Sequence, residues 1–249
     1  MNSGAFVSQN VKKAIIICGG EGTRLRPMTY DTPKPLVKVN GIPVIDNAVR
    51  ELKRNGIEKI TMAVGYKKEM FIGHFGDGSG MGIDIDYSIE EKLLGTGGAM
   101  KKALEEKTLP EAGEDVLVVN GDNIFEIDLN RMHDLHCSKN ALATLAVKAA
   151  DDVTGYGVIS VDDGIIRKFV EKPDPKDAES NLINLGIYLF DSGAMHMLPD
   201  AGAFSMERDF FTKISGTGRL CAYVSDKIWY PIDTMERYKK ASEEWRPIG

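Results

Sequence analysis

Short apolar runs alternate with helical segments through the first half of the chain, and this alternation constrains the fold more than any other feature. Residues 13–18 (KAIIIC) form an apolar run that ends in two glycines, a pattern typical of a buried parallel strand that enters a loop. Residues 43–55 have helical spacing, begin at a proline and stop before a glycine. By the same criteria, strands are expected over 57–64, 83–89 and 116–119, and a helix over 97–106. Because such alternating elements form right-handed crossovers, we expect an α/β fold with a Rossmann-like, mostly parallel central sheet flanked by helices.

The character of the sequence changes after residue 140. Apolar runs with little helix between them predict strands over 141–149, 157–161, 165–170 and 185–190. They indicate a smaller, β-rich lobe at about 141–232 that continues the sheet of the part at about 12–140. Helical spacing over 205–215 and 234–246 predicts two more helices, the second at the C-terminus. Residues 1–11 are small and polar and predict a loose leader, so we expect residues 12–249 to form a single domain.

The distribution of charge narrows the classes of partner. The chain has a net charge of −6, yet residues 11–38 carry six basic and two acidic side chains. An acidic protein repels nucleic acid, so no nucleic-acid partner is expected, whereas a basic, glycine-rich segment suits a small anion. No uncharged stretch approaches the roughly 20 residues that span a bilayer, so no membrane contact is expected either. Three widely spaced cysteines and no recognisable signal peptide predict a cytoplasmic protein with free thiols.

A glycine-rich loop follows the first predicted strand. Residues 18–27 read CGGEGTRLRP; the glycines let backbone N–H groups approach phosphates, and the two arginines supply positive charge. The loop is not a Rossmann fingerprint, because Leu25 occupies the place of the last glycine. It is not a Walker A loop, because the chain has no Gly-Lys-Ser/Thr. On its own, the loop is equally consistent with an ordinary glycine turn.

The continuation of this loop gives it a more specific interpretation. Residues 19–36 read GGEGTRLRPMTYDTPKPL, and this double motif resembles the sugar-1-phosphate nucleotidylyltransferase (NDP-sugar pyrophosphorylase) family. Further elements in the family's order are LGTGGA (94–99), NGDN (120–123), YGV (156–158), EKP (171–173), NLGIY (184–188) and WYPID (229–233). The resemblance covers about residues 12–240. It implies a Mg²⁺-dependent transfer of a nucleotidyl group from a nucleoside triphosphate to a sugar-1-phosphate, with release of pyrophosphate.

The resemblance also implies roles for individual residues. The nucleotide-binding residues would be Cys18, Gly19, Gly20, Gly22, Thr23, Arg24, Glu90, Gly95, Thr96, Gly97 and Asp122. The residues that bind the sugar phosphate would be Asn123, Gly157, Glu171, Lys172 and Asn184. The Mg²⁺ ligands would be Asp122 and Asp233, and the catalytic set would be Arg24, Lys34, Asp122, Lys172 and Asp233.

The two expected metal ligands differ in how well they match the family. Asp122 follows a predicted buried strand, where α/β sheets bind ligands, although a turn aspartate is the simpler alternative. Asp233 lies in Asp-Thr-Met-Glu, where the family's usual D-x-G-T is missing. The alternative for Asp233 is a helix N-cap, with Glu236 completing a pattern like a capping box. Both roles can hold at once.

The nucleobase and the sugar are less constrained than the reaction. Glu90 lies five residues before Gly95; its carboxylate only accepts hydrogen bonds, and guanine offers two adjacent donors, which favours GTP. The LGTGGA loop and FSMERD (204–209) look most like short mannose- or heptose-1-phosphate guanylyltransferases. Thymidylyl, uridylyl or cytidylyl transfer to glucose-1-phosphate stays open, and PIDT (231–234) favours the cytidylyl branch.

Other classes of function are weaker alternatives. A regulatory paralogue that binds nucleotide-sugar without turnover would be expected to lose the arginine or a metal aspartate, and this chain retains both. A dinucleotide-dependent oxidoreductase is disfavoured by the failed fingerprint. A homodimer is the general expectation for such a protein.

One further cluster has metal-like spacing. His133, His136 and Cys137 lie on a predicted helix at i, i+3 and i+4. A zinc site usually needs three or four ligands, and no partner segment is evident. The cluster is therefore interpreted as an exposed helix face rather than a metal site.

Overall fold

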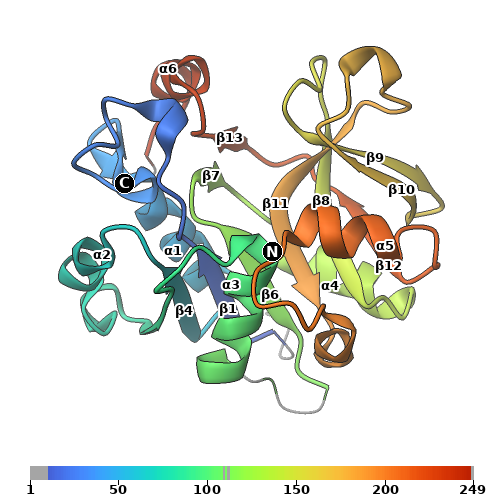
Figure 1. Ribbon diagram of the computed structural model, residues 1–249, viewed down its shortest axis with the longest axis horizontal. Helices are drawn as coiled ribbons and strands as arrows, with labels where there is room; N and C mark the ends of the chain where they lie inside the picture. Colours follow the sequence, from blue (N-terminus) through green and yellow to red (C-terminus); the bar gives the residue numbers. More distant parts are fainter. Residues whose placement is uncertain (1–10, 109, 111–112, 248–249) are drawn as a thin grey trace, which may run out of the picture.

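The computed structural model describes residues 11–108, 110 and 113–247. A nine-stranded sheet in the order β5-β4-β1-β6-β11-β8-β12-β10-β9 runs through the molecule (Figure 1). Its strands are β1 (Lys13–Ile17), β4 (Lys59–Val64), β5 (Asp84–Ile89), β6 (Val116–Asn120), β8 (Ala143–Ala149), β9 (Gly157–Asp162), β10 (Ile165–Glu171), β11 (Leu182–Phe190) and β12 (Leu220–Val224). Two small ribbons pair β2 (Lys38–Val39) with β3 (Ile42–Pro43) and β7 (Asn123–Phe125) with β13 (Trp229–Pro231).

The half of the sheet formed by β5, β4, β1 and β6 is parallel, as the strand–helix alternation predicts. Its connections contain α1 (Val44–Arg54), α2 (Lys68–Phe75) and α3 (Gly95–Ala103). Successive residues of β1 point to opposite faces. Ala14 and Ile16 pack in the core on the side of α1, and Ile15 packs in the core on the side of α3. Burial on both faces explains why β1 is a continuous apolar run.

The other half continues the sheet, as predicted, but with mixed pairing. β11 is antiparallel to β6 and to β8, β12 is parallel to β8, and β10 is antiparallel to β12 and to β9. The register of β11 against β8 shifts between Asn184 and Tyr188. Gly186 lies in this bulge with a φ of +72°, and a Cβ there would come within 2.5 Å of the Asn120 side chain. The bulge therefore requires glycine at this point.

The remaining elements cover the sheet or connect its strands. They are α4 (Leu129–Ser138), α5 (Thr212–Ile214), α6 (Met235–Glu244), the 3₁₀ turns η1 (Thr23–Leu25), η2 (Lys34–Leu36), η3 (Ser79–Met81), η5 (Pro175–Asp177) and η6 (Ser192–Met197), and the π-helical turns η4 (Leu104–Thr108) and η7 (Met206–Phe211). The helix expected over 97–106 is α3 followed by η4, and the one expected over 205–215 is η7 followed by α5. No helix in the described part of the chain is both long and apolar enough to cross a membrane.

The C-terminal helix α6 packs against the segment between β1 and α1 (Figure 1). Trp245 and Ala241 belong to a small apolar cluster with Leu25 and Val39. Asn40 Nδ2 donates a hydrogen bond of 2.7 Å to the carbonyl of Trp245. This packing places Asp233, which lies just before α6, next to Arg24 in the loop that follows β1.

The expected leader meets the core earlier than predicted. Val11 is completely buried in the core cluster on the α1 side of the sheet, so the prediction of a loose segment is wrong at this residue. An isolated valine among polar residues gives no periodic signal, which is why the pattern missed it. Residues 1–10 of the expected leader lie outside the described residues.

Candidate active site

Two cavities open at the carboxyl ends of the central parallel strands. The larger one, of about 620 Å³, includes residues of β9, β10 and β11 in its lining, and the smaller one, of about 310 Å³, is lined by the loop that follows β1. Five residues line both: Arg24, Thr96, Asn120, Asp122 and Asp233. Since ligands of α/β proteins bind at this edge, the shared wall is where two bound molecules would meet.

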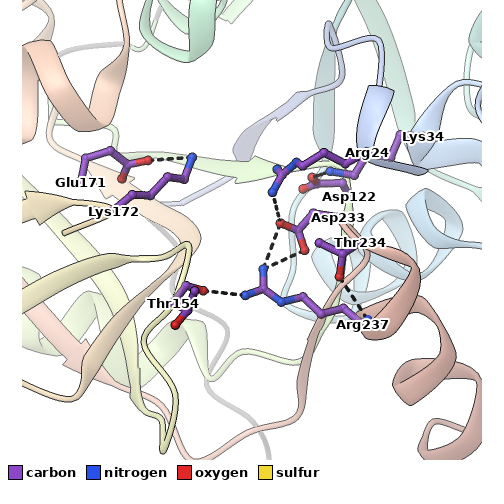
Figure 2. A network of polar contacts seen from close by, with 9 residues as sticks. All are labelled: Arg24, Lys34, Asp122, Thr154, Glu171, Lys172, Asp233, Thr234 and Arg237. Atoms are coloured by element: carbon purple, nitrogen blue, oxygen red, sulfur yellow. Dashed lines mark hydrogen bonds and ion pairs between the residues drawn. The ribbon is translucent and has the colours of Figure 1, made fainter. Parts of the chain in front are cut away.

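The loop after β1 forms the smaller cavity. Six residues of this loop that the resemblance assigns to nucleotide binding line it, and so does Lys34, which the resemblance assigns to catalysis; the six are Cys18, Gly19, Gly20, Gly22, Thr23 and Arg24. Gly22 has a φ of +63°, and a Cβ there would come within 2.8 Å of the Lys34 Cβ. A glycine at this position therefore lets the loop pack directly on Lys34, whose amino group is ion-paired with Asp122 (Figure 2).

Asp233 is held by two arginines, Arg24 and Arg237 (Figure 2). Arg24 Nη1 lies 2.9 Å from Asp233 Oδ2, and Arg237 Nη1 contacts both carboxylate oxygens at 2.9 and 3.0 Å. Burial alone would raise the pKa of Asp233, but the hydrogen bonds and charge of Arg237, and then the charges of Arg24 and Lys34, lower it below its usual value. The carboxylate is thus kept ionised.

Sequence reasoning missed Arg237 and misplaced the helix cap. The N-cap of α6 is Thr234, whose hydroxyl accepts a 3.2 Å hydrogen bond from the Arg237 backbone N–H. The N-cap alternative for Asp233 is therefore wrong: Asp233 precedes the cap. Arg237 also donates to the Thr154 carbonyl at 2.9 Å and lies 3.9 Å from the centre of the Tyr156 ring. Its i+4 spacing from Asp233 was the signal available in the sequence.

The residues expected to bind the sugar phosphate line the larger cavity. Glu171 and Lys172 form an ion pair of 3.1 Å across this cavity from Asp233 (Figure 2), and the Lys172 side chain is 55% exposed. Gly157 has no room for a side chain, because a Cβ would lie 2.7 Å from the Phe169 ring and 3.0 Å from Glu171. The backbone therefore borders the cavity there.

The two asparagines of this group are partly engaged by the protein itself. Asn184 Nδ2 donates to the Tyr188 hydroxyl at 2.8 Å, and its oxygen accepts from the Gly186 N–H at 3.2 Å. Asn123 is buried, and its Nδ2 donates to the Leu185 carbonyl at 3.1 Å. Both line the larger cavity, and these bonds fix their orientation.

Glu90 is buried next to the glycine loop and does not line either cavity. Its Oε2 accepts a 3.1 Å hydrogen bond from the Leu94 N–H, while its buried Oε1 has no hydrogen-bond partner among the described residues. A Cβ on Gly19 would overlap that Oε1. Burial raises the pKa of Glu90, against the lowering effects of the Leu94 N–H and the Lys102 charge. Buried polar groups are normally hydrogen-bonded, so this oxygen is free to accept from a further donor.

The second glycine loop departs from expectation at Gly97. Gly95 and Thr96 line the larger cavity, but the N–H of Gly97 donates to the Phe204 carbonyl at 3.0 Å. A Cβ at Gly97 would overlap the Phe204 ring. The N–H of Gly97 is therefore already used within the protein, and the absence of a side chain leaves room for the Phe204 ring.

The segment after Phe204 supplies cavity residues to which sequence reasoning gave no role. Ser205, Glu207 and Arg208 line the larger cavity. The buried Glu207 accepts hydrogen bonds of 2.7 Å from the hydroxyls of Thr96 and Ser205. The FSMERD motif was the signal here. Tyr156 and Trp229 add an aromatic wall, with ring centres 5.6 Å apart.

The prediction of an exposed face at His133, His136 and Cys137 is wrong for the two histidines. His136 is 3% exposed, and His133 Nε2 lies 3.2 Å from the buried carboxylate of Asp115. Asp115 immediately precedes β6 and is the partner segment that the sequence pattern could not show. Burial, followed by the charge of Asp191, raises the pKa of Asp115 to about 7, and burial lowers the pKa of His136 to about 4.

Comparison with known proteins identifies the class of this protein. The sequence profile of the nucleotidyl transferase family matches residues 13–246, and the chain belongs to this family. The resemblance drawn from the glycine loop and PKPL is thereby confirmed, and so is the α/β fold class. Family membership and the cavity wall together support sugar-1-phosphate nucleotidyl transfer.

Individual relatives refine this picture. The chain is 35% identical to D-glycero-α-D-manno-heptose 1-phosphate guanylyltransferase of Aneurinibacillus thermoaerophilus, over 93% of this chain and 97% of the relative. It is 31% identical to mannose-1-phosphate guanylyltransferase of Mycobacterium tuberculosis, over 93% of this chain and 64% of that longer relative. The crystal structure of HddC from Yersinia pseudotuberculosis complexed with GMP-PN is similar with a TM-score of 0.78 and 29% identity, over 94% of this chain and 99% of that one.

Proposed function

We propose that this chain transfers a guanylyl group from GTP to a heptose- or mannose-1-phosphate and releases pyrophosphate. The observation that carries the proposal is the wall shared by two cavities, in which Asp122 and Asp233 lie against Lys34 and Arg24. The smaller cavity suits the phosphates of a nucleotide, because it is bordered by glycine backbone. The larger cavity suits a sugar phosphate, because it offers carboxylate, amide and ammonium groups. The two guanylyltransferase relatives support the choice of base and of sugar.

The chemistry asks the protein for positioning and charge. An oxygen of the sugar phosphate attacks the α-phosphorus in line, and pyrophosphate departs on the opposite side. The attacking oxygen is already an anion and needs no general base, so repulsion between anions is the main obstacle. In our proposal Arg24 stabilises the leaving pyrophosphate, Lys34 neutralises charge near the transferred phosphorus, and the exposed Lys172 orients the sugar phosphate.

The shared wall also suits a divalent cation. Asp122 and Asp233 offer carboxylate oxygens beside the place where phosphates would lie, the combination by which Mg²⁺ is usually held. We propose that these two residues hold Mg²⁺. When bound, the ion would offset the negative charge of the two substrates. The arginine and lysine that now face the carboxylates would then be available to phosphate oxygens.

The choice of guanine rests on Glu90, which does not itself line the smaller cavity but lies directly against Gly19, which does. Its free Oε1 and the paired Oε2 are both acceptors in the ionised form, and guanine presents N1–H and N2–H₂ side by side. Thymine and uracil present one ring N–H, so only guanine can donate to both oxygens at once. One additional hydrogen bond to a charged group is worth about 1.5–3 kcal/mol, enough to discriminate between bases.

The test is pyrophosphate release with ATP, GTP, CTP, UTP and TTP against heptose-, mannose- and glucose-1-phosphate, with Mg²⁺ present. GTP with mannose- or heptose-1-phosphate should be the best pair, and Asp122→Ala should lower its turnover at least ~100-fold. Glu126→Ala, the loss of an acidic residue that lines neither cavity, is the control and should keep normal turnover.

Two results would contradict the proposal in different ways. A preference for TTP, UTP or CTP with glucose-1-phosphate would leave the reaction class intact and overturn the choice of substrates. Tight nucleotide-sugar binding without turnover of any pair would instead indicate a regulatory protein.

A further inference from the structure

A second cluster of ligand-type side chains lies at the other end of β6. Asp115 immediately precedes the first residue of this strand, whereas Asp122 lies two residues after its last. The five strand residues between them span roughly 16 Å. One ligand atom each from Asp115, His133 and Cys137 lies within 4.8 Å of the others. The cluster is therefore separate from the cavities of the proposed transfer reaction.

The spacing of these atoms suits a tetrahedral metal ion. His133 Nε2 lies 3.2 Å from Asp115 Oδ2 and 3.4 Å from Cys137 Sγ. Bonds of about 2.0–2.3 Å in a tetrahedral zinc site place neighbouring ligand atoms roughly 3.3–3.8 Å apart. His133 and Cys137 are at i and i+4 on α4 and so share a face of that helix. The donors thus belong to a helix and a strand end that are already in place.

His136 gives an independent indication of a missing ligand. It is 3% exposed, and its Nδ1 contacts the Thr144 hydroxyl at 2.8 Å. Its Nε2 is buried and has no hydrogen-bond partner in the part of the chain that the structure describes. That nitrogen lies 3.9 Å from the same Asp115 Oδ2 that faces His133. Buried ring nitrogens are normally satisfied, and a contact through the other nitrogen is how metal-binding histidines are oriented.

We propose that Asp115, His133 and Cys137, whose ligand atoms already lie together, bind one Zn²⁺ ion as a structural site, and that His136, whose Nε2 faces the same Asp115 oxygen, completes it as the fourth ligand. Thiolate and imidazole donors select Zn²⁺ over Mg²⁺ or Ca²⁺, and four protein ligands leave no open position for a substrate. Binding releases the proton of the Cys137 thiol. The carboxylate and the thiolate then balance the charge of the ion, so the assembly is neutral. The ion would join α4 to the start of β6.

The test begins with the full chain, stripped of metal and titrated with Zn²⁺ against a coloured chelator. We expect one tight equivalent per chain and a rise in the unfolding temperature, because the ion binds only the folded state. Cys137→Ala and His133→Ala should each weaken binding at least ~10-fold. Cys137 is exposed and His133 only half-buried, so both variants should fold, which circular dichroism checks.

Two control variants separate this site from others. His196→Ala removes an exposed histidine elsewhere, and Asp122→Ala removes a proposed Mg²⁺ ligand; both should bind Zn²⁺ like the parent chain. Co²⁺ should give a thiolate charge-transfer band that is absent in Cys137→Ala. The proposal is overturned if the parent binds no tight equivalent, if His133→Ala or Cys137→Ala binds as well as the parent, or if Asp122→Ala abolishes binding. None of these results bears on nucleotidyl transfer.

Discussion

At the scale of the residue, each acidic side chain of the shared wall is matched by basic ones. Lys34 faces Asp122, and Arg24 and Arg237 face Asp233. Buried carboxylates without such partners would be strongly destabilised. The lowered pKa of Asp233 means that its ion pairs contribute stability above the usual aspartate pKa, and that this contribution is lost as the pH falls through the lowered value. Substrate phosphates would compete with the carboxylates for the same cations.

Glu90 provides the sharpest test at this scale. We expect Glu90→Gln to lower kcat/KM for GTP by about 10- to 100-fold, the equivalent of about 1–3 kcal/mol for an unsatisfied buried group. The reason is that the amide offers one acceptor where guanine presents two donors. Steady-state kinetics with GTP and with a second nucleotide give the ratio. Glu91→Gln is the matched control, because Glu91 is exposed and pairs with Lys68.

The raised pKa of Glu90 predicts how GTP use depends on pH. Only the ionised carboxylate accepts from both guanine donors. KM for GTP should therefore rise as the pH falls through that raised pKa, and the rise should be missing in Glu90→Gln. A parent enzyme and a Glu90→Gln variant with the same base preference and the same pH profile would show that Glu90 does not contact the base.

At the scale of the element, the periodic patterns predicted most of the architecture. Helix α1 ends at Arg54, two residues before Gly56, as the glycine predicts. Strand β1 is the apolar run that leads into the glycine loop. The patterns were less successful where contacts with other elements determine the local structure. The π-helical turns η4 and η7 interrupt segments with ordinary helical spacing. The face of α4 that carries His133 was predicted to be exposed, but Asp115, eighteen residues earlier in the chain, packs against it.

Gly97 allows a direct test of one such contact between elements. Gly97→Ala should destabilise the protein by about 1–3 kcal/mol, because the new Cβ would overlap the Phe204 ring and force α3 and the Phe204 segment apart. Chemical unfolding monitored by circular dichroism measures the change. Gly73→Ala is the matched control: Gly73 is in α2 and has open space at its Cβ. There, alanine should stabilise the protein by up to about 1 kcal/mol. Equal free energies of unfolding for the two variants would show that the Phe204 ring moves aside without loss of stability.

At the scale of the whole molecule, the site joins residues that are far apart in sequence. Arg24 and Asp233 come from opposite ends of the chain and meet at 2.9 Å. No periodicity or local propensity reports such a contact; the family resemblance predicted that both act at one site. It did not predict Arg237 or Glu207, which act through hydrogen bonds to residues the motifs name. The order of the strands in the mixed half also depends on such long-range packing.

The meeting of Arg24 and Asp233 depends on how α6 docks. Trp245, at the end of α6, is buried in a cluster with Leu25 and Val39. Trp245→Ala should lower the free energy of unfolding by about 3 kcal/mol, because the cavity left behind separates the C-terminal helix from the loop region. It should also lower kcat/KM in conditions where the protein stays folded, since α6 carries Arg237 and fixes Asp233.

Urea unfolding and steady-state kinetics below the transition separate these two effects. Val224→Ala, a truncation of an exposed aliphatic side chain, is the control and should stay within about 0.5 kcal/mol of the parent. If Trp245→Ala is destabilised but keeps the parent kcat/KM, the ion pairs of Asp233 alone hold the end of the chain in place. If kcat/KM and the free energy of unfolding both fall, the packing of α6 against Leu25 and Val39 is what assembles the catalytic wall. The two ends of the chain then act as one unit.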